Sequence, residues 1–289
     1  MLCEKPLSVN AEGAARMVDA AEASGRMHMV NFSYRNWPAV QQAKRLIEAG
    51  RLGKLLYFEG HFFQDHNGDE TIPRHWRFER SRAGSGALGD VGSHIIDLAR
   101  LLVGDFDSVV ANQRTFTQRR PLPRDRSQLA PVDTDDFVTM MVEFANGATG
   151  HIGASWSLPG YKNDVAFTIV GERGAIRFSW ENSNELQFFT ADDPAELSGY
   201  RSILIGRAHP GADLFWYPDL GGKQGLGTTA QGIGYGEAFA LSFRQLLASL
   251  KAGQSPSPNF VDGLRCSEIL DAVIQSAESR AWVDVRRLR

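Results

Sequence analysis

Residues 84–104 read GSGALGDVGSHIIDLARLLVG. The segment begins as a glycine-rich loop and continues as an amphipathic helix, because apolar residues recur at helical spacing and Gly104 supplies a C-terminal stop. The apolar stripe consists of Ile95, Leu98, Leu101 and Leu102. The pattern predicts a junction between loop and helix that packs one face against a core.

Two polar residues, Asp90 and His94, stand four positions apart at this junction. If the first helical turn is formed at Asp90, both side chains project from the same face. A carboxylate beside an imidazole at a glycine-bordered helix start suits proton transfer. The alternative, and on these two residues alone the commoner arrangement, is that Asp90 only caps the helix and His94 is a half-buried surface residue.

The segment from Gly84 to Gly89 also fits the pattern G-x-G-x-x-G of dinucleotide-binding loops. That pattern binds pyrophosphate only where a buried strand leads into it. Residues 76–82 read instead as a charged loop, and no acidic residue ends a second strand about 20 residues further on. We therefore reject a phosphate-binding role for this loop.

The composition is that of an ordinary globular protein. The chain has 289 residues, enough for one large or two modest domains, with 43% hydrophobic and 22% charged residues. A net charge of −3 without a basic block argues against nucleic acid or an anionic membrane as partner. The separated cysteines, Cys3 and Cys266, and the lack of a signal peptide or membrane span predict a cytoplasmic protein.

The N-terminus reads as one βαβ unit. Residues 1–3 resemble the end of a buried strand, a helix follows with Ser8 or Asn10 as its cap, and residues 27–32 form a second strand. Two strands separated by a helix predict a parallel pair. Because a doubly wound sheet needs more strands, the sequence looks as if it begins inside a domain.

The remainder predicts a second sheet of mainly antiparallel strands. Turn signals at Asn146-Gly147 and at Gly171–Gly174 predict hairpins. The expected strands and closing helices are residues 55–64, 137–144, 149–158, 165–170, 175–180, 186–190, 237–252, 261–279 and 282–285. The long glycine-rich segment 206–236 is typical of a functional loop or an interface.

Four segments carry motifs in a fixed order. They are Cys3-Glu4-Lys5-Pro6-Leu7; Gln64-Asp65 with Trp76-Arg77; residues 86–97, which fit G-x-x-x-D-x-G-x-H-x-x-D; and Pro258, Asp262-Gly263 and Ser276 near the C-terminus. Together they resemble the glucose–fructose oxidoreductase / inositol dehydrogenase (Gfo/Idh/MocA) family over nearly the whole chain. One departure is His66, which stands where the family's Q-D-W motif has tryptophan.

The resemblance implies a fold of the α/β plus α+β class. Residues 1–32 would be the C-terminal remnant of a Rossmann domain. Residues 33–289 would form a substrate and oligomerisation domain, built on a large, mainly antiparallel sheet with helices on one face. The resemblance also implies NAD or NADP as cofactor, a sugar or cyclitol oxidised at a secondary hydroxyl, and a homo-oligomer, either dimer or tetramer.

Carried over by motif, Lys5, Asp90 and His94 would be the catalytic residues, and Glu4, Lys5 and Pro6 would contact the cofactor. The resemblance further implies a cis peptide bond between Lys5 and Pro6. The chemistry agrees: an imidazole titrating near neutrality suits the removal of the hydroxyl proton, and an ammonium stabilises the developing alkoxide. Asp90 would orient Lys5 or His94, or accept a neighbouring hydroxyl.

Aromatic faces and amide dipoles suit polyols, so a sugar pocket would draw on a second set of side chains. The candidates are Tyr34, Arg35, Gln64, Trp76 and Trp156. Each of them alone is equally typical of a packing residue. A metal site would have to draw on His61, His66, His75 and Asp65, whose spacing matches no familiar ligand set, so we expect no metal.

The part of a Rossmann domain that holds the glycine-rich turn and the ribose-binding acid, on the order of 90 residues, has no counterpart before Met1. The sequence is therefore expected to be a truncated form of an ordinary dehydrogenase. The alternative is a non-catalytic sugar-binding or assembly protein that has lost the cofactor site. Which sugar is bound, NAD versus NADP, and the oligomer size are not fixed by the sequence.

Overall fold

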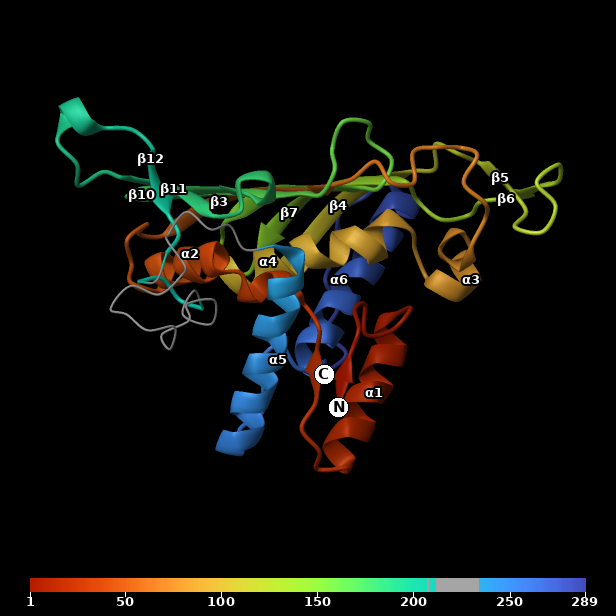
Figure 1. The fold of residues 1–289 in the computed structure, drawn as a ribbon, viewed down its shortest axis with the longest axis horizontal. Coiled ribbons are helices and arrows are strands. Elements are labelled where there is room, and N and C mark those ends of the chain that lie inside the picture. The colour runs from red at the N-terminus through yellow and green to blue at the C-terminus, as the bar shows by residue number, and fades with distance from the viewer. Residues whose placement is uncertain (207, 212–233) are drawn as a thin grey trace, which may run out of the picture.

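A large mixed β-sheet forms the main layer of the molecule (Figure 1). The structure is a computed structural model that describes residues 1–206, 208–211 and 234–289. Most of the glycine-rich segment 206–236 therefore lies outside the described residues. Within the described ranges, no helix is both long enough and apolar enough to cross a membrane.

Nine strands of the described chain form this sheet. In spatial order they are β12 (Arg201–Leu204), β11 (Glu185–Thr190), β10 (Gly174–Ser179), β9 (Asp164–Gly171), β3 (Leu55–Phe63), β8 (Thr149–Ser155), β7 (Phe137–Phe144), β4 (Phe106–Arg114) and β13 (Val283–Asp284). Every neighbouring pair is antiparallel except β3 and β8, which are parallel. The expected mainly antiparallel sheet is thus confirmed.

The hairpins follow from the turn residues. β7 and β8 are joined through Asn146 and Gly147, and Gly147 has a φ of 85°, which favours glycine. β9 and β10 are joined at Gly171–Gly174. Strands β4 and β12, and a small hairpin of β5 (Arg119–Pro121) and β6 (Leu129–Pro131), form without a turn signal that would have predicted them.

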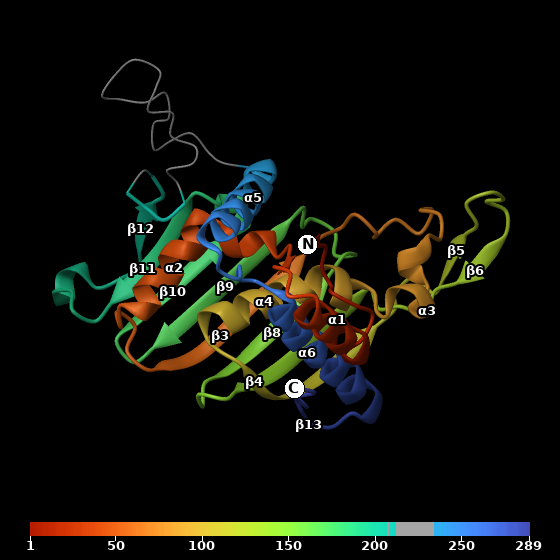
Figure 2. The ribbon, with the colours of Figure 1, turned by 90° about the horizontal axis from the view of Figure 1, so that it is seen from below.

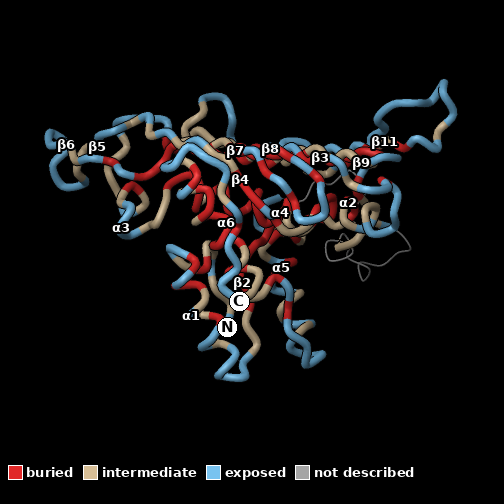
Figure 3. The backbone as a smooth tube through the Cα atoms, turned by 180° about the vertical axis from the view of Figure 1, so that it is seen from behind, coloured by how far each residue is buried: buried red, intermediate tan, exposed pale blue. Residues whose placement is uncertain are grey.

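Helices cover one face of the sheet, as expected. Figure 2 shows α2 (Pro38–Glu48), α4 (Ser93–Leu102) and α6 (Phe260–Ser279) lying across the strands on the same side. The buried part of the chain lies between these helices and the sheet (Figure 3). Two further helices are α3 (Arg80–Ala83) and α5 (Tyr235–Ala252).

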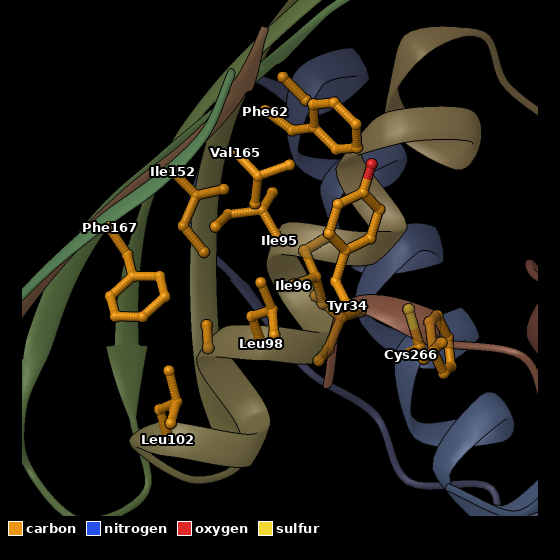
Figure 4. Packing of buried hydrophobic residues seen from close by; sticks show 14 of the residues in the cluster. Tyr34, Phe62, Ile95, Ile96, Leu98, Leu102, Ile152, Val165, Phe167 and Cys266 are labelled. Atoms are coloured by element: carbon orange, nitrogen blue, oxygen red, sulfur yellow. The ribbon is translucent and has the colours of Figure 1, made fainter. Parts of the chain in front are cut away.

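The core explains why α4 occupies the centre of this layer. In Figure 4 the apolar stripe of α4 faces side chains from β8 and β9, including Ile152, Val165 and Phe167. Ile95 and Leu98 are fully buried. Burying a side chain of this size stabilises the fold by about 1.5–3 kcal/mol, so the stripe holds the glycine-rich junction firmly against the sheet.

The N-terminal unit packs beside α6 (Figure 1). It consists of β1 (Leu2–Cys3), α1 (Ala11–Ala23) and β2 (Met29–Val30), and its two strands pair in parallel as predicted. Of the two expected caps, Asn10 caps α1 by accepting the N–H of Gly13. The segment after β1 lies close to α6, since a Cβ atom on Gly263 of α6 would lie 2.9 Å from the Leu7 side chain.

The alternation of faces along β3 yields a stability prediction. Phe58 is fully buried under the helices, whereas Glu59, the next residue, is exposed on the opposite face. Phe58→Ala is expected to lower the free energy of unfolding by about 3–5 kcal/mol through loss of apolar contact and creation of a cavity. Glu59→Ala should change it by no more than about 0.5 kcal/mol. Urea denaturation of both variants tests this; equal losses would contradict the assigned faces.

Candidate active site

A cavity of about 1050 Å³ opens where the end of β1, the start of α4 and the ends of β3 and β9 come together. Lys5, Asp90 and His94 all line it. The chain therefore brings together, from positions far apart in the sequence, the three residues predicted to be catalytic.

The glycine-rich loop is shaped by a carboxylate of this chain. Asp135, buried between β6 and β7, accepts the N–H groups of Gly86 and Leu88, each at 2.7 Å. A Cβ atom on Gly86 would lie 2.0 Å from the Asp135 carbonyl oxygen, so only glycine fits. The loop follows the short helix α3 rather than a strand, consistent with the rejection of a phosphate loop.

Asp90 lies in a π-helical turn, Leu88–Gly92, that leads into α4. The Lys5 ammonium donates to the Asp90 carbonyl oxygen and to Oδ1, the latter at 3.0 Å, and Arg77 Nε lies 3.6 Å from Oδ2. Burial raises the pKa of the Asp90 carboxyl, but the Lys5 and Arg77 cations outweigh burial and leave this pKa below its ordinary value. Asp90 is therefore an ionised partner of Lys5.

His94 lies in the first turn of α4 and is only 7% exposed. Its ring contacts Tyr34 edge-on, with centroids 4.8 Å apart, and lies 5.9 Å from Phe62. Burial, helped by the Lys5 charge, lowers the pKa of His94 well below its ordinary value. The imidazole is therefore neutral near pH 7.

The buried Nδ1 atom of His94 has no hydrogen-bond partner among the described residues. A buried ring nitrogen without a partner lowers the stability of the fold. The half-buried surface residue considered from the sequence is thus wrong for His94. Asp90 also gives α4 no side-chain cap, since the N-cap residue is Gly92.

The residues expected to contact the cofactor follow β1 directly. Glu4, Lys5 and Pro6 all line the cavity, and the peptide bond between Lys5 and Pro6 is cis, as the family resemblance implied. Glu4 is exposed, and its Oε1 accepts the Asn31 side-chain amide at 2.7 Å. These residues lie at the carboxyl end of a parallel strand, where α/β sheets bind their ligands.

Of the five residues proposed to hold a sugar, Tyr34, Gln64 and Trp76 line the cavity. Trp76 is 43% exposed, and the Arg77 guanidinium lies over its ring at 4.5 Å. Trp180, whose ring centroid is 4.6 Å from that of Tyr34, adds a further aromatic face. One side of the cavity is therefore aromatic, as polyol binding requires.

Arg35 and Trp156 are not among the described residues that line the cavity, which corrects their expected role. Arg35 is buried and donates to both carboxylate oxygens of Asp97 at 2.6 Å, because its planar fork matches a carboxylate. Trp156 is fully buried, and its indole N–H donates to Asp136 Oδ1 at 2.8 Å. Both are structural residues.

Several described residues that the sequence did not single out for the site also line the cavity, among them Asn163 and Tyr235. Asn163 lies opposite Gln64, because the antiparallel register of β3 and β9 pairs Phe63 with Asp164 and the next position brings these two together. Only the register reveals this proximity, so no local sequence pattern could have found Asn163.

The residues considered for a metal site have separate partners. His61 pairs with Asp164 at 2.8 Å, His75 packs on Phe78, and Asp65 pairs with Lys162. His66 lies near Trp156, with ring centroids 6.4 Å apart. In the part of the chain that the structure describes, no three His, Cys, Asp or Glu side chains are grouped so as to hold a metal ion.

Residues 40–177 match the model of the GFO/IDH/MocA C-terminal domain. A levoglucosan dehydrogenase from Pseudarthrobacter phenanthrenivorans is 39% identical over 299 aligned residues, covering 100% of this chain and 74% of that protein. The scyllo-inositol 2-dehydrogenase (NAD(+)) of Bacillus subtilis is 30% identical over 174 residues, covering 60% of this chain and 46% of that protein.

Solved structures show the same likeness. A levoglucosan dehydrogenase in complex with NADH and levoglucosan has a TM-score of 0.92 at 41% identity, covering 99% of this chain and 73% of that chain. An NAD binding oxidoreductase from Klebsiella pneumoniae has a TM-score of 0.90 at 33% identity, covering 99% of this chain and 73% of that chain. The likeness thus includes the N-terminal βαβ unit as well as the sheet.

The ion pair of Arg35 and Asp97 should matter for stability. Arg35→Met would leave the Asp97 carboxylate buried without its main partner, which is expected to cost about 3–5 kcal/mol of unfolding free energy. The double variant Arg35→Met/Asp97→Leu should recover much of that loss. Denaturant unfolding measures both. A stable Arg35→Met protein with weakened sugar binding would restore the role first expected for Arg35.

The lowered pKa of His94 predicts a pH dependence of stability. Below the unfolded-state pKa of about 6.5, the unfolded chain binds a proton at this histidine that the folded protein excludes. The free energy of unfolding should therefore fall as pH drops, with His94 contributing at most about 1.4 kcal/mol per pH unit. Urea unfolding between about pH 5 and about pH 7 should give a shallower slope for His94→Gln. The exposed His151→Gln is the control, and identical slopes for both variants would contradict the prediction.

Proposed function

The chain belongs to the Gfo/Idh/MocA family of oxidoreductases, and on that premise we propose that it is an NAD(P)-dependent dehydrogenase. The reaction would transfer a hydride between nicotinamide and a secondary hydroxyl of a sugar or cyclitol. One observation carries the proposal: Lys5, Asp90 and His94 line the same aromatic-walled cavity. A charged donor and a neutral imidazole there provide the two functions that oxidation of an alcohol needs.

The cavity fits a nicotinamide beside a sugar. Its volume of about 1050 Å³ lies at the upper end of the range for small-molecule sites, which leaves room for two partners. Lys5, Arg77 and Arg82 add cationic lining that suits an anionic dinucleotide, while Glu4 and Pro6 line the wall at the end of β1. When bound, nicotinamide supplies the hydride acceptor or donor.

The residues of this chain would then manage the proton and the charge. The neutral His94 takes the hydroxyl proton as the carbonyl forms, a step that general-base catalysis accelerates by about 10²–10⁴-fold. The Lys5 ammonium donates a hydrogen bond to the developing alkoxide. Asp90 holds that ammonium in place through the contacts at Oδ1 and at its backbone oxygen.

The lining favours a neutral polyol as substrate. Tyr34, Phe62 and Trp180 offer apolar ring faces, and Gln64 and Asn163 offer amide groups. Sugars and cyclitols present apolar C–H faces and a rim of hydroxyls, which match such a surface. Levoglucosan and inositol, the substrates named for the relatives, both have this chemistry.

The domain and assembly assignments extend this proposal. Residues 1–32 would be part of a Rossmann nucleotide-binding domain, and residues 33–289 the substrate domain. The parallel pairing of β1 with β2 supports the first assignment. We also propose a homo-oligomer, a dimer or tetramer, in which the sheet face opposite the helices takes part; that face exposes Met141 of β7 to 55%.

The proposal is tested by titrating the purified chain with NADH and NADPH while following energy transfer from its tryptophans. Saturable binding, followed by reduction of NAD or NADP with levoglucosan, myo-inositol or D-xylose, would support the dehydrogenase. Sugar binding that needs no nicotinamide, with no turnover at any sugar, would favour the non-catalytic sugar-binding protein instead.

Variants of the catalytic residues give a sharper prediction. His94→Gln removes the base and should lower kcat by about 10²–10⁴-fold. Lys5→Met removes the donor to the alkoxide and should lower kcat by about 10²–10³-fold. The affinity of His94→Gln for NADH should stay within about twofold of the parent, because His94 lies on the aromatic side of the cavity. Steady-state kinetics and the titration measure both quantities. An unchanged kcat in His94→Gln would refute its role as base.

A further inference from the structure

Asn163 connects two other residues of the cavity through its side-chain amide. Its Oδ1 accepts from Gln64 Nε2 at 2.5 Å, and its Nδ2 donates to the Tyr34 hydroxyl oxygen at 3.1 Å. The three residues come from η1 (Ser33–Asn36), the end of β3 and the start of β9, and all three line the cavity. One amide thus links three segments at the sugar side of the site.

This arrangement leaves one hydrogen-bond donor, on Tyr34, and one acceptor, on Gln64, for a ligand in the cavity. Because the Tyr34 oxygen accepts a hydrogen bond from Asn163, its own O–H proton remains available. Among the described residues, this proton makes no hydrogen bond. Gln64 uses its N–H group on Asn163, so its Oε1 remains available as an acceptor. In Figure 4 the Tyr34 hydroxyl points toward Phe62 and away from Cys266.

Tyr34 can keep this donor role across the physiological range. Burial raises the pKa of its hydroxyl well above the ordinary value, and the hydrogen bond from Asn163 offsets only part of that rise. The aromatic rings of His94 and Trp180 both contact the Tyr34 ring, with centroids 4.8 and 4.6 Å from its own. The hydroxyl is therefore protonated and fixed in position.

We propose that Asn163 is a specificity-determining positioning residue, whose amide sets Tyr34 as a hydrogen-bond donor and Gln64 as an acceptor for two neighbouring oxygens of the sugar. The proposal rests on the function proposed above and adds the feature of the substrate that the site selects. A sugar that lacks the hydroxyl donating to Gln64 leaves a buried acceptor unpaired, so a deoxy analogue is rejected. An amide is required at position 163, because a carboxylate has no proton to donate to Tyr34.

The competing explanation is that Asn163 only ties the segment before β9 to η1. In that case the direction of its hydrogen bonds has no consequence for ligands. Asn163→Asp separates the two explanations, since aspartate preserves the shape and both contacts but accepts from both neighbours. Tyr34 must then donate to residue 163 and is lost as a donor to the sugar.

The experiment is a double-mutant cycle on the full chain with saturating NADH, using calorimetric titration with levoglucosan and with myo-inositol. Tyr34→Phe is expected to weaken binding of the better ligand by about tenfold when residue 163 is asparagine, the effect of losing one hydrogen bond. In the Asn163→Asp background the same change should weaken binding by less than about twofold. Asn182→Asp, an exposed amide outside the cavity, controls for the added charge.

An equal effect of Tyr34→Phe in both backgrounds would overturn the role of Asn163, as would Asn163→Asp binding as tightly as the parent. A second readout needs no ligand: the tyrosine Fermi doublet in the Raman difference spectrum between parent and Asn163→Asp should report Tyr34 changing from acceptor to donor. If the parent binds neither sugar nor NADH, the proposed function fails. The spectrum then decides the role of Asn163 alone, and an unchanged doublet overturns it.

Discussion

The contact between the Lys5 ammonium and Asp90 is the interaction on which the site depends. It joins the loop after β1 to the π-helical turn before α4, two segments that otherwise belong to different layers. The Lys5 and Arg77 cations keep the Asp90 carboxyl ionised, because they outweigh the burial that raises its pKa. Burial, together with the same ammonium, lowers the pKa of His94 and keeps the imidazole neutral. The ion pair thus contributes to the charge state of both Asp90 and His94.

The second constraint is the pair of hydrogen bonds that the Asp135 carboxylate accepts from the glycine-rich loop. Two backbone N–H groups that would bind a phosphate in a nucleotide site here bind a carboxylate from the strand layer. These hydrogen bonds, together with the buried apolar stripe of α4, fix where the helix begins. They therefore also fix where Asp90 and His94 lie. The frame therefore holds both side chains in fixed positions at the wall of the cavity. Preorganisation of this kind is what catalysis by fixed charges requires.

Local signals in the sequence were sufficient for some of the local contacts. Asn146-Gly147 marked its hairpin, whereas the hairpin of β5 and β6 carries no such signal. Motifs of fixed spacing pointed to Lys5, Asp90 and His94, which the structure brings together in one cavity. Local signals failed where the partner is distant: Arg35 and Trp156 read as sugar-binding residues, but their partners, Asp97 and Asp136, turn them into core residues. Asn163 was missed for the same reason, since only the register of β3 with β9 brings it to Gln64.

The central proposal is that hydride transfer takes place in the cavity lined by Lys5 and His94. A crystal structure of the chain with NADH and levoglucosan tests it most directly. We expect the sugar to lie against Tyr34 and Trp180, with one hydroxyl oxygen within hydrogen-bond distance of both His94 and Lys5. The nicotinamide ring should lie over the carbon that bears this hydroxyl. Ligand density on the open face of the sheet, or a sugar whose hydroxyls do not reach His94, would contradict it.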